Sequence, residues 1–403
     1  MTTIAEKFKA LATDNAPGQE ARQGAGDTEG LMRGERLSGE PVDFSHGDVD
    51  AFTPPPDALG AFLEGVGQGG QQAYTEYRGT LDIRQRVAGH LARFTGAPVD
   101  AEAGMILTPG TQGALFLAMA ATVAAGDKVA IVQPDYFANR KLAAFLGGTI
   151  CPVRLDYMAG QSAGLDLNDL RAVFEAGARV LVFSNPNNPT GAVYSREEIA
   201  AIAGLASEFG AAVIVDQLYS RLSYEGTEYT HLRAGQIGAD QVITIIGPSK
   251  TESLSGYRLG VAFGAPAVIA RMEKLQAIVS LRAAGYNQAV FNTWFEEPQG
   301  WMSERIRVHQ AIRDDLLSVF KQAGMSVRTP QAGSYLFPEL PSLSVEPQDF
   351  VRLLRLQAHV IVTPGSEFGP DTASSIRLNF SQDHAAAVGA AHRIVEMVRR
   401  YAD

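Results

Sequence analysis

Lys250 and Arg258 are the first residues of this sequence whose types and spacing suggest chemistry. They lie in GPSKTESLSGYRLG, residues 247–260, directly after an apolar run at 242–246 that is typical of a buried strand. Lysine is rarely buried, so Lys250 belongs either to an ordinary solvated loop or to a site. In a site, its amine could attack a carbonyl carbon, and the arginine eight residues later could bind an anion.

Three other segments stand at or just beyond predicted strand ends, where open α/β sheets bind ligands. They are TPGTQG at 108–113, SNPNNPTG at 184–191 and DQLY at 216–219. Each has an ordinary explanation by itself: a helix start, a turn and a helix-capping aspartate. Together with the lysine segment, they indicate one site.

The combined residue types match the needs of pyridoxal 5′-phosphate (PLP). This cofactor requires a lysine for a Schiff base, a carboxylate at its ring nitrogen, and donors for its phosphate and ring oxygen. We expect Lys250 to supply the amine and Asp216 the carboxylate, which keeps the ring nitrogen protonated. Asn188 and Tyr219 can donate to the ring oxygen, which lowers the pKa of the Schiff base.

The phosphate of this cofactor has its own predicted binding site. Gly110, Thr111 and Gln112 open a predicted helix, whose free amides and dipole favour a dianion. Ser249 and Arg258 can add a hydroxyl and a charge-assisted hydrogen bond.

The elements that must position these residues alternate along the chain. Strand-like runs at 128–132, 179–183, 212–215 and 242–246 are separated by helical stretches, which predicts an α/β fold with a mostly parallel central sheet flanked by helices. Shorter strands at 334–337, 359–363 and 376–380 among long amphipathic helices predict a smaller α+β domain. We expect an N-terminal arm that joins the small domain at 1–45, a large cofactor-binding domain at 46–295, and a small C-terminal domain at 296–403.

With these motifs in the same order and spacing, the chain resembles the class I/II aminotransferases of PLP fold type I, and specifically aspartate aminotransferase. The resemblance runs from about Gly47 to the C-terminus and depends on NPNNPTG, D-x-x-Y, and SK followed by Arg at plus eight. It implies that Lys250 is the Schiff-base lysine and proton carrier, with Asp216 and Tyr219 as catalytic partners. It also implies that Tyr136 stacks on the cofactor ring, although Tyr136 could instead be a core tyrosine.

The resemblance further implies a homodimer with shared active sites and names substrate-binding residues. Tyr74 would reach the phosphate bound by the neighbouring subunit. Arg377, in SIRLNFS, would clamp the substrate α-carboxylate, unless it is a salt-bridged strand arginine. Gly47, in GDVDAFTP, would approach the substrate, although LSGEP at 37–41 imitates that motif. Asn188 would contribute on the substrate side as well.

Two positions depart from the family pattern or leave its meaning open. Gly247 stands where the family often has Ser or Thr in contact with the phosphate. Arg282, 32 residues after Lys250, lies near the place where aspartate aminotransferases carry an arginine that crosses the dimer interface to a side-chain carboxylate. Arg282 could equally be a solvated helix residue. As a clamp, it would favour Asp, Glu and their oxo acids.

The reaction implied is transamination, in which an amino group moves from an L-amino acid to a 2-oxo acid. The alternatives are another PLP enzyme on the same scaffold, such as a lyase, decarboxylase, synthase or amino-acid oxidase, because cofactor residues are shared among them. A ligand-sensing regulatory module is a further alternative, but no convincing basic helix-turn-helix pattern precedes Gly47.

Composition excludes several other classes of function. The formal charge of −10 opposes nucleic-acid binding, and the scattered histidines lack metal-ligand spacing. GVGQGG at 65–70 follows a helix-like stretch instead of the strand that a dinucleotide fingerprint requires. With the single cysteine Cys151, no signal-peptide core and no apolar stretch that could cross a bilayer, we expect a cytoplasmic protein that binds no membrane.

Overall fold

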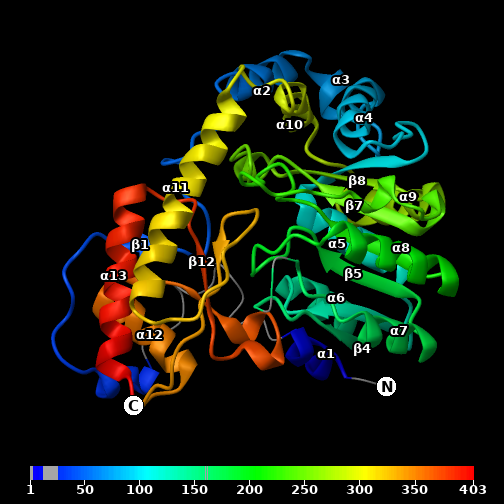
Figure 1. The fold of residues 1–403 in the computed structure, drawn as a ribbon. Helices are drawn as coiled ribbons and strands as arrows, with labels where there is room; N and C mark the ends of the chain where they lie inside the picture. The colour runs from blue at the N-terminus through cyan, green and yellow to red at the C-terminus, as the bar shows by residue number, and fades with distance from the viewer. Residues whose placement is uncertain (1–2, 12–25, 159, 161) are drawn as a thin grey trace.

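The computed structural model describes residues 3–11, 26–158, 160 and 162–403, and it places a large sheet region beside a smaller region (Figure 1). The large region centres on a seven-stranded sheet. In spatial order its strands are β2 (Met105–Pro109), β8 (Leu259–Gly264), β7 (Val242–Ile246), β6 (Ala212–Asp216), β5 (Val180–Ser184), β3 (Lys128–Gln133) and β4 (Thr149–Arg154).

Most neighbours in this sheet are parallel, as the sequence predicts. Strand β8 is antiparallel to β2 and to β7, and the other four pairs are parallel. The four strand-like runs predicted from sequence are strands β3, β5, β6 and β7, with bounds that differ by at most one residue at either end.

Helices cover both faces of this sheet. They are α4 (Leu81–Thr95), α5 (Gly110–Thr122), α6 (Phe137–Phe145), α7 (Leu167–Glu175), α8 (Arg196–Phe209) and α9 (Pro266–Val279). Alternate residues of β5 show the two faces: Leu181 and Phe183 pack in a core with α7 and α8, whereas Val180 and Val182 pack in another with α5 and α9. Because both faces are buried, the strands read as nearly continuous apolar runs.

The smaller region combines two small sheets with three helices. The long helices are α11 (Trp301–Gln322), α12 (Pro347–Ala358) and α13 (His384–Tyr401). A three-stranded antiparallel sheet runs in the order β11 (Thr363–Pro364), β12 (Ile376–Asn379) and β9 (Tyr335–Leu336), and β1 (Val42–Asp43) pairs in parallel with β10 (Val360–Ile361). The strands are shorter than predicted, but they lie in the predicted places.

The N-terminal part of the chain spans both regions. Helix α1 (Ile4–Leu11) lies against α6, where the Lys7 ammonium sits 4.1 Å from the ring centre of Phe145. Val42 and Phe44 instead join the core of the smaller region. Residues 1–2 and 12–25 of the predicted N-terminal arm lie outside the described residues.

Local sequence signals explain several element boundaries. Ser195 and Glu198 form the predicted capping box at the start of α8, each side chain accepting a backbone N–H of the other residue. Helix α2 (Ala58–Gly67) contains the start of the GVGQGG stretch, and the short helices α3 (Gly70–Ala73) and α10 (Gly285–Gln288) lie nearby. The glycines therefore follow no strand. Among the described helices, none is long and apolar enough to cross a membrane.

Candidate active site

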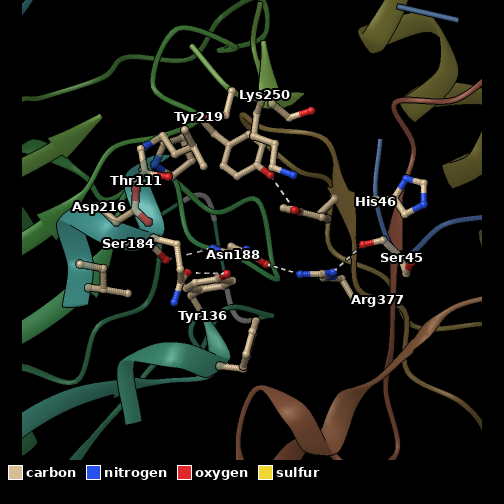
Figure 2. A pocket seen from close by; sticks show the side chains of 18 of the residues that line it. Ser45, His46, Thr111, Tyr136, Ser184, Asn188, Asp216, Tyr219, Lys250 and Arg377 are labelled. Carbon is tan, nitrogen blue, oxygen red and sulfur yellow. Dashed lines mark hydrogen bonds between the residues drawn. The ribbon is translucent and has the colours of Figure 1, made fainter. Parts of the chain in front are cut away.

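One cavity gathers most of the residues that the sequence singled out. It encloses about 1010 Å³, part of which is open to solvent, between the sheet and the smaller region. Figure 2 shows its walls. Ten predicted residues line it: Thr111, Gln112, Tyr136, Asn188, Asp216, Tyr219, Ser249, Lys250, Arg258 and Arg377.

Sheet topology brings the polar residues of the large region together. Strands β5, β6 and β7 are parallel neighbours, with Ser184 beside Asp216 and Asp216 beside Ile245 in register. Their carboxyl ends therefore meet at one edge of the sheet, and the loops that follow carry Asn188, Tyr219 and Lys250. Residues up to 62 positions apart in sequence, Asn188 and Lys250, thus reach one cavity.

The Lys250 amine faces this cavity without a partner in the described part of the chain. Neither a hydrogen bond nor an ion pair holds its Nζ there, although the side chain is half-buried. A free primary amine in a polar cavity is available to react with an aldehyde.

Asp216, the last residue of β6, places a carboxylate in the cavity wall. Its Oδ1 accepts a hydrogen bond from the Leu218 N–H at 2.9 Å. Burial raises the pKa of Asp216 to about 6, against the opposing effect of that hydrogen bond. A cationic ring nitrogen beside the carboxylate would offset the cost of burial and favour the ionised form.

A tight contact at the start of α5 forms an anion cradle. Gly110 has φ of +75°, and a Cβ there would lie 2.6 Å from Arg258 Nη2, so only glycine lets the guanidinium approach the helix start. Arg258 itself has φ of 52° and donates from Nη1 to the Ser255 carbonyl at 2.9 Å. Thr111, Ser249 and Ser255 add hydroxyls around the same cavity.

Close packing explains why position 247 is a glycine. A Cβ at Gly247 would lie 3.0 Å from Thr111 Cγ2, 3.0 Å from the Leu259 carbonyl oxygen and 3.2 Å from Gly260 Cα. The Thr111 side chain therefore takes the space that a hydroxyl-bearing residue at 247 would need. Ser255 was not predicted, and it supplies a hydroxyl in the cavity wall instead.

Arg377 is a buried cation without a carboxylate partner. It is 2% exposed, and within the described residues its three hydrogen bonds go to neutral oxygens. Two go to Asn188 Oδ1 at 3.1 Å and the Ser45 carbonyl at 3.1 Å (Figure 2), and the third goes to Thr363 Oγ1 at 3.4 Å. Its Nε has no partner. The alternative of a salt-bridged strand arginine is thus absent from the described structure. A buried, unpaired guanidinium strongly favours an incoming carboxylate.

The buried carboxyl group of Asp135 is linked to Asn188 through the Ser184 hydroxyl. The Asn188 N–H donates to Ser184 Oγ at 3.1 Å, and that hydroxyl donates to Asp135. Asp135 also accepts the backbone N–H groups of Ser184 at 2.8 Å and of Tyr136 at 2.6 Å. Burial raises the pKa of Asp135 to about 8, whereas these hydrogen bonds lower it. Sequence reasoning missed Asp135 and Ser184, although Asp135 immediately precedes Tyr136.

The tyrosines of the cavity are hydrogen-bonded to one another and to Gln112. The Tyr136 hydroxyl donates to Gln112 Oε1 at 3.0 Å. The hydroxyls of Tyr219 and Tyr335 are 2.6 Å apart, and both side chains are buried. Tyr335 was also missed, because its strand carried no motif.

The turn around Gly47 forms part of the opposite wall, but Gly47 itself does not line the cavity. Its neighbours Ser45 and His46 do. A Cβ at Gly47 would approach Ser381 Cβ to 3.3 Å, so the glycine allows the turn to pack closely. A hydrogen bond to Asp43 raises the pKa of His46 to about 9, against the opposing effect of burial.

Tyr74 and Arg282 lie outside the cavity of their own chain, next to each other. Tyr74 is 82% exposed, and the Arg282 guanidinium sits 5.7 Å from its ring centre and 5.6 Å from that of Tyr77. Arg282 follows the end of α9 in a turn, so it is not a helix residue. The structure therefore groups ten predicted residues and Gly110 in one place, and these two in another.

The sheet and the site define a class of enzyme. Within the described part of the chain, a lysine amine without a partner, a buried carboxylate, a helix start beside Arg258 and an arginine without a carboxylate partner surround one cavity at the carboxyl ends of parallel strands. These are the groups that a PLP enzyme acting on amino acids requires.

The chain belongs to the class I and II aminotransferases, whose family model matches residues 40–394. The crystal structure of an aspartate aminotransferase from Rhodobacter sphaeroides 2.4.1 is 64% identical, with a TM-score of 0.96 and coverage of 100% of both chains. An aspartate aminotransferase from Sulfolobus acidocaldarius is 28% identical over 338 residues, 82% of this chain and 84% of that protein. An arginine-pyruvate transaminase from Pseudomonas aeruginosa is 26% identical over 336 residues, 83% of this chain and 84% of that protein.

The protein is thus a PLP-dependent aminotransferase that acts on amino acids and 2-oxo acids. The residues present fit the cofactor. Among the described residues the Lys250 amine has no partner and Asp216 pairs with no cation, and a Cβ at position 110 would lie 2.6 Å from Arg258 Nη2. When bound, PLP accepts the electrons released from the substrate Cα–H bond.

Proposed function

We propose that Lys250, Asp216 and Tyr219 are the catalytic residues of this aminotransferase. The Lys250 amine binds the cofactor covalently and, once an amino acid displaces it, carries the proton that leaves the substrate Cα. Asp216 keeps a ring nitrogen protonated. Tyr219 donates its hydroxyl hydrogen to the ring oxygen, as does the Asn188 side-chain amide.

The remaining residues bind and orient. The start of α5, with Gly110, Thr111 and Gln112, receives the phosphate together with Ser249 and Arg258. Tyr136 packs against the cofactor ring. In a dimer, Tyr74 reaches the cofactor phosphate bound by the neighbouring subunit.

Arg377 binds the α-carboxylate of both substrates, with Gly47 providing the close packing of the facing turn. The observation that carries this proposal is the lack of any carboxylate near the buried guanidinium among the described residues, in the cavity that Lys250 also faces. Binding a planar carboxylate by a two-pronged hydrogen bond orients the Cα–H bond of the substrate.

Covalent trapping tests the lysine. Borohydride reduction of the holoenzyme, followed by peptide mass spectrometry, should place the reduced cofactor on Lys250. The K250A variant should lose turnover, whereas K274A, which changes an exposed lysine of α9, should retain it. Labelling of another lysine would contradict the assignment.

A half-reaction assay tests the reaction type against the other PLP chemistries. With an amino donor and no acceptor, the enzyme should release up to one equivalent of 2-oxo acid per active site and then stop. Continued release, or release of carbon dioxide or ammonia, would indicate a decarboxylase, a lyase or an oxidase.

We propose that acidic amino acids are the preferred donors. The Rhodobacter relative is named an aspartate aminotransferase and is 64% identical over both full chains. Arg282 would bind the side-chain carboxylate of a substrate held by the neighbouring subunit, through a charge-assisted pair worth about 1.5 to 3 kcal/mol.

A donor panel tests this specificity. R282A should lower kcat/KM for aspartate and glutamate far more than for alanine or phenylalanine. R271A removes an exposed arginine of α9 and should change neither. Equal losses for all donors would leave a general amino-acid aminotransferase.

We propose that two copies form a homodimer with shared sites. Exposed apolar side chains gather on α2 and on the segments beside Tyr74 and Arg282, and a soluble monomer rarely leaves such a patch open. They are Leu59, Leu63, Val66, Tyr74, Tyr77, Ile278, Val279 and Leu281. The patch fits a second copy because Tyr74 and Arg282 lie within it, outside their own cavity.

Subunit mixing tests the shared site. K250A and R282A subunits are each defective, but a hybrid dimer contains one cavity with both native residues. Mixing should therefore restore aspartate turnover, and sedimentation should report a dimer. A monomer, or no restoration in verified hybrids, would reject the arrangement.

We propose that the domain division follows the cores, with residues 46–295 as the large domain and 296–403, joined by 1–45, as the small one. Val42 and Phe44 pack with residues of α11, α12 and α13. Limited proteolysis should cut first near 296–300, and a first cut within the central sheet would contradict this division.

We also propose a cytoplasmic location, supported by the single cysteine, Cys151, which leaves no intrachain disulfide to require an oxidising compartment. Cell fractionation would test it, and recovery in a secreted fraction would contradict it.

A further inference from the structure

Tyr335 lies between two residues with proposed roles on opposite sides of the cavity. It comes from β9, which pairs with β12, the strand that carries Arg377. Its ring centre is 4.3 Å from the Arg377 guanidinium carbon, and Phe368 lies 4.8 Å from the same carbon. Its hydroxyl is 2.6 Å from the Tyr219 hydroxyl. One side chain therefore contacts both the substrate arginine and the cofactor tyrosine.

Tyr335 and Tyr219 share one hydrogen bond, and their 2.6 Å separation is compatible with donation in either direction. Burial opposes ionisation of Tyr335, but the cations of Arg377 and Lys250 and the hydrogen bond shared with Tyr219 lower its pKa overall, with Asp216 opposing them. Burial raises the pKa of Tyr219 instead. If Tyr219 gives its one hydrogen to the cofactor ring oxygen, as proposed above, its oxygen can only accept within the pair, and Tyr335 is then the donor.

We propose that Tyr335 is a positioning residue that links Arg377 to Tyr219. Its ring holds the guanidinium by a cation–π contact, and its hydroxyl donates to the Tyr219 oxygen. Since a hydroxyl has one hydrogen, the Tyr219 hydrogen is then directed to the cavity, where it can donate to the cofactor ring oxygen. This inference rests on the proposed roles of Tyr219 and Arg377.

The arrangement links substrate binding to the cofactor contact. A hydrogen bond received from Tyr335 polarises the Tyr219 hydroxyl and strengthens the bond that it donates. When a substrate carboxylate neutralises Arg377, the cation stacked on Tyr335 loses part of its field, and Tyr335 becomes a weaker donor. The Tyr219 contact then weakens as the substrate arrives.

The variants Y335F and Y335L separate the two functions of the residue. Y335F removes the hydroxyl and keeps the ring on Arg377, whereas Y335L removes both. The principal readout is the pKa of the visible absorption of the bound cofactor. Because Tyr219 donation favours the deprotonated chromophore, Y335F should raise this pKa by about 0.5 to 1 unit, the size expected for one lost hydrogen bond.

Kinetics should separate the two variants as well. Y335F should change KM for the amino donor little, while Y335L should raise KM several-fold through loss of the stacked ring. The matched control is Y157F, which removes a buried hydroxyl outside this cavity and should leave both readouts at wild-type values.

A double-mutant cycle distinguishes this coupling from a merely structural effect. If Tyr335 acts through Tyr219, the Y219F/Y335F double variant should show the absorption pKa of Y219F alone. Additive shifts would overturn the proposal. If Y219F shifts the pKa and Y335F does not, Tyr335 has no such role and the proposed site stands. If neither shifts it, the proposed place of Tyr219 is wrong, and the inference fails with it.

Discussion

The two walls of the cavity hold their charged groups in different ways. On the sheet side, Asp216 and Arg258 bind backbone groups two and three residues away in sequence. On the side of the smaller region, Arg377 binds Asn188 and the Ser45 carbonyl, which are 189 and 332 residues away. The wall proposed to bind the cofactor (the cofactor wall) is thus set by local structure. The wall proposed to bind the substrate (the substrate wall) is set by the way distant segments meet.

The two walls also differ in the electrostatic cost of burying their charged groups. The sheet wall carries charges of both signs, whereas Arg377 is buried among neutral oxygens and aromatic rings. Leaving a cation without a counter-ion is costly in the folded protein, and a substrate carboxylate relieves that cost. Changes to the sheet wall should therefore affect chemistry and cofactor affinity, and changes to the other wall should affect substrate affinity.

The strongest disruption of the sheet wall should come from D216N. A neutral amide cannot hold a ring nitrogen protonated, so kcat should fall by about 10² to 10³-fold, the cost typical of losing a key electrostatic contact. Steady-state kinetics of the folded holoenzyme measure this.

The control for that variant is D166A. Asp166 caps α7 by accepting the N–H groups of Asn168 and Asp169, so its loss should cost about 1 kcal/mol of stability and leave kcat unchanged. Near-normal turnover in D216N would mean that Asp216 only caps a turn.

On the opposite wall, R377K should have a smaller effect, which lowers kcat/KM but does not reduce cofactor binding. Lysine keeps the charge but loses the planar two-pronged geometry, so kcat/KM should fall about 10 to 100-fold, equivalent to 1.5 to 3 kcal/mol. The absorption of the bound cofactor should persist. R307K, at an exposed arginine of α11, is the control. A loss of cofactor in R377K would contradict the division into a cofactor wall and a substrate wall.

Two glycine variants test whether the cofactor wall depends on the local contact between Gly110 and Arg258. Gly110 and Gly126 have φ of +75° and +90°, so alanine at either position should strain the backbone by about 1 to 2 kcal/mol. Only at Gly110 does the new Cβ meet Arg258, and Gly126 has open space. G110A alone should weaken PLP affinity, by about tenfold if one charged contact is lost. PLP affinity is measured by titration of the apoenzyme. Equal affinity in both variants would contradict a phosphate site formed by Arg258 at the start of α5.

The smallest expected effect is the pH dependence of His46. Its folded pKa of about 9 exceeds the ordinary value of 6.5, so its stabilising contribution is complete below pH 6.5 and is lost as pH rises through 9. Because the side chain is 61% exposed, that contribution should be below about 1 kcal/mol. The Tm difference between wild type and H46Q should shrink from pH 6.5 to 9. A difference that stays constant would show that the charge contributes nothing.

Sequence alone predicted the sheet wall well because its signals are local. Apolar runs marked β5, β6 and β7, and residues just beyond them had to share an edge once the strands were parallel. Lys250 and Asn188 therefore fell into the cavity from strand order alone. The shorter strands of the smaller region were predicted in the right places but too long. A strand with only two to four residues shows too little alternation of apolar and polar residues to mark its ends.

The other residues could not be found in the same way. Tyr335 contacts Tyr219 from 116 residues away, and no motif marks either its strand or its register. Asp135 supports Asn188 through Ser184, which needs the side-by-side packing of β3 and β5. The proposed roles of Tyr74 and Arg282 in a neighbouring subunit remain predictions that only a second chain can test.

The pairing of β1 with β10 has a consequence for the order of assembly during synthesis. Val42 is made 318 residues before its partner Val360. The seven strands of the central sheet are complete once Gly264 is made, so that sheet can form while the chain is still growing. The segment with Ser45 must wait until Val360 and Ile361 have been made, because β1 has no strand to pair with before then. A nascent chain should therefore acquire its cofactor wall before it can hold a substrate.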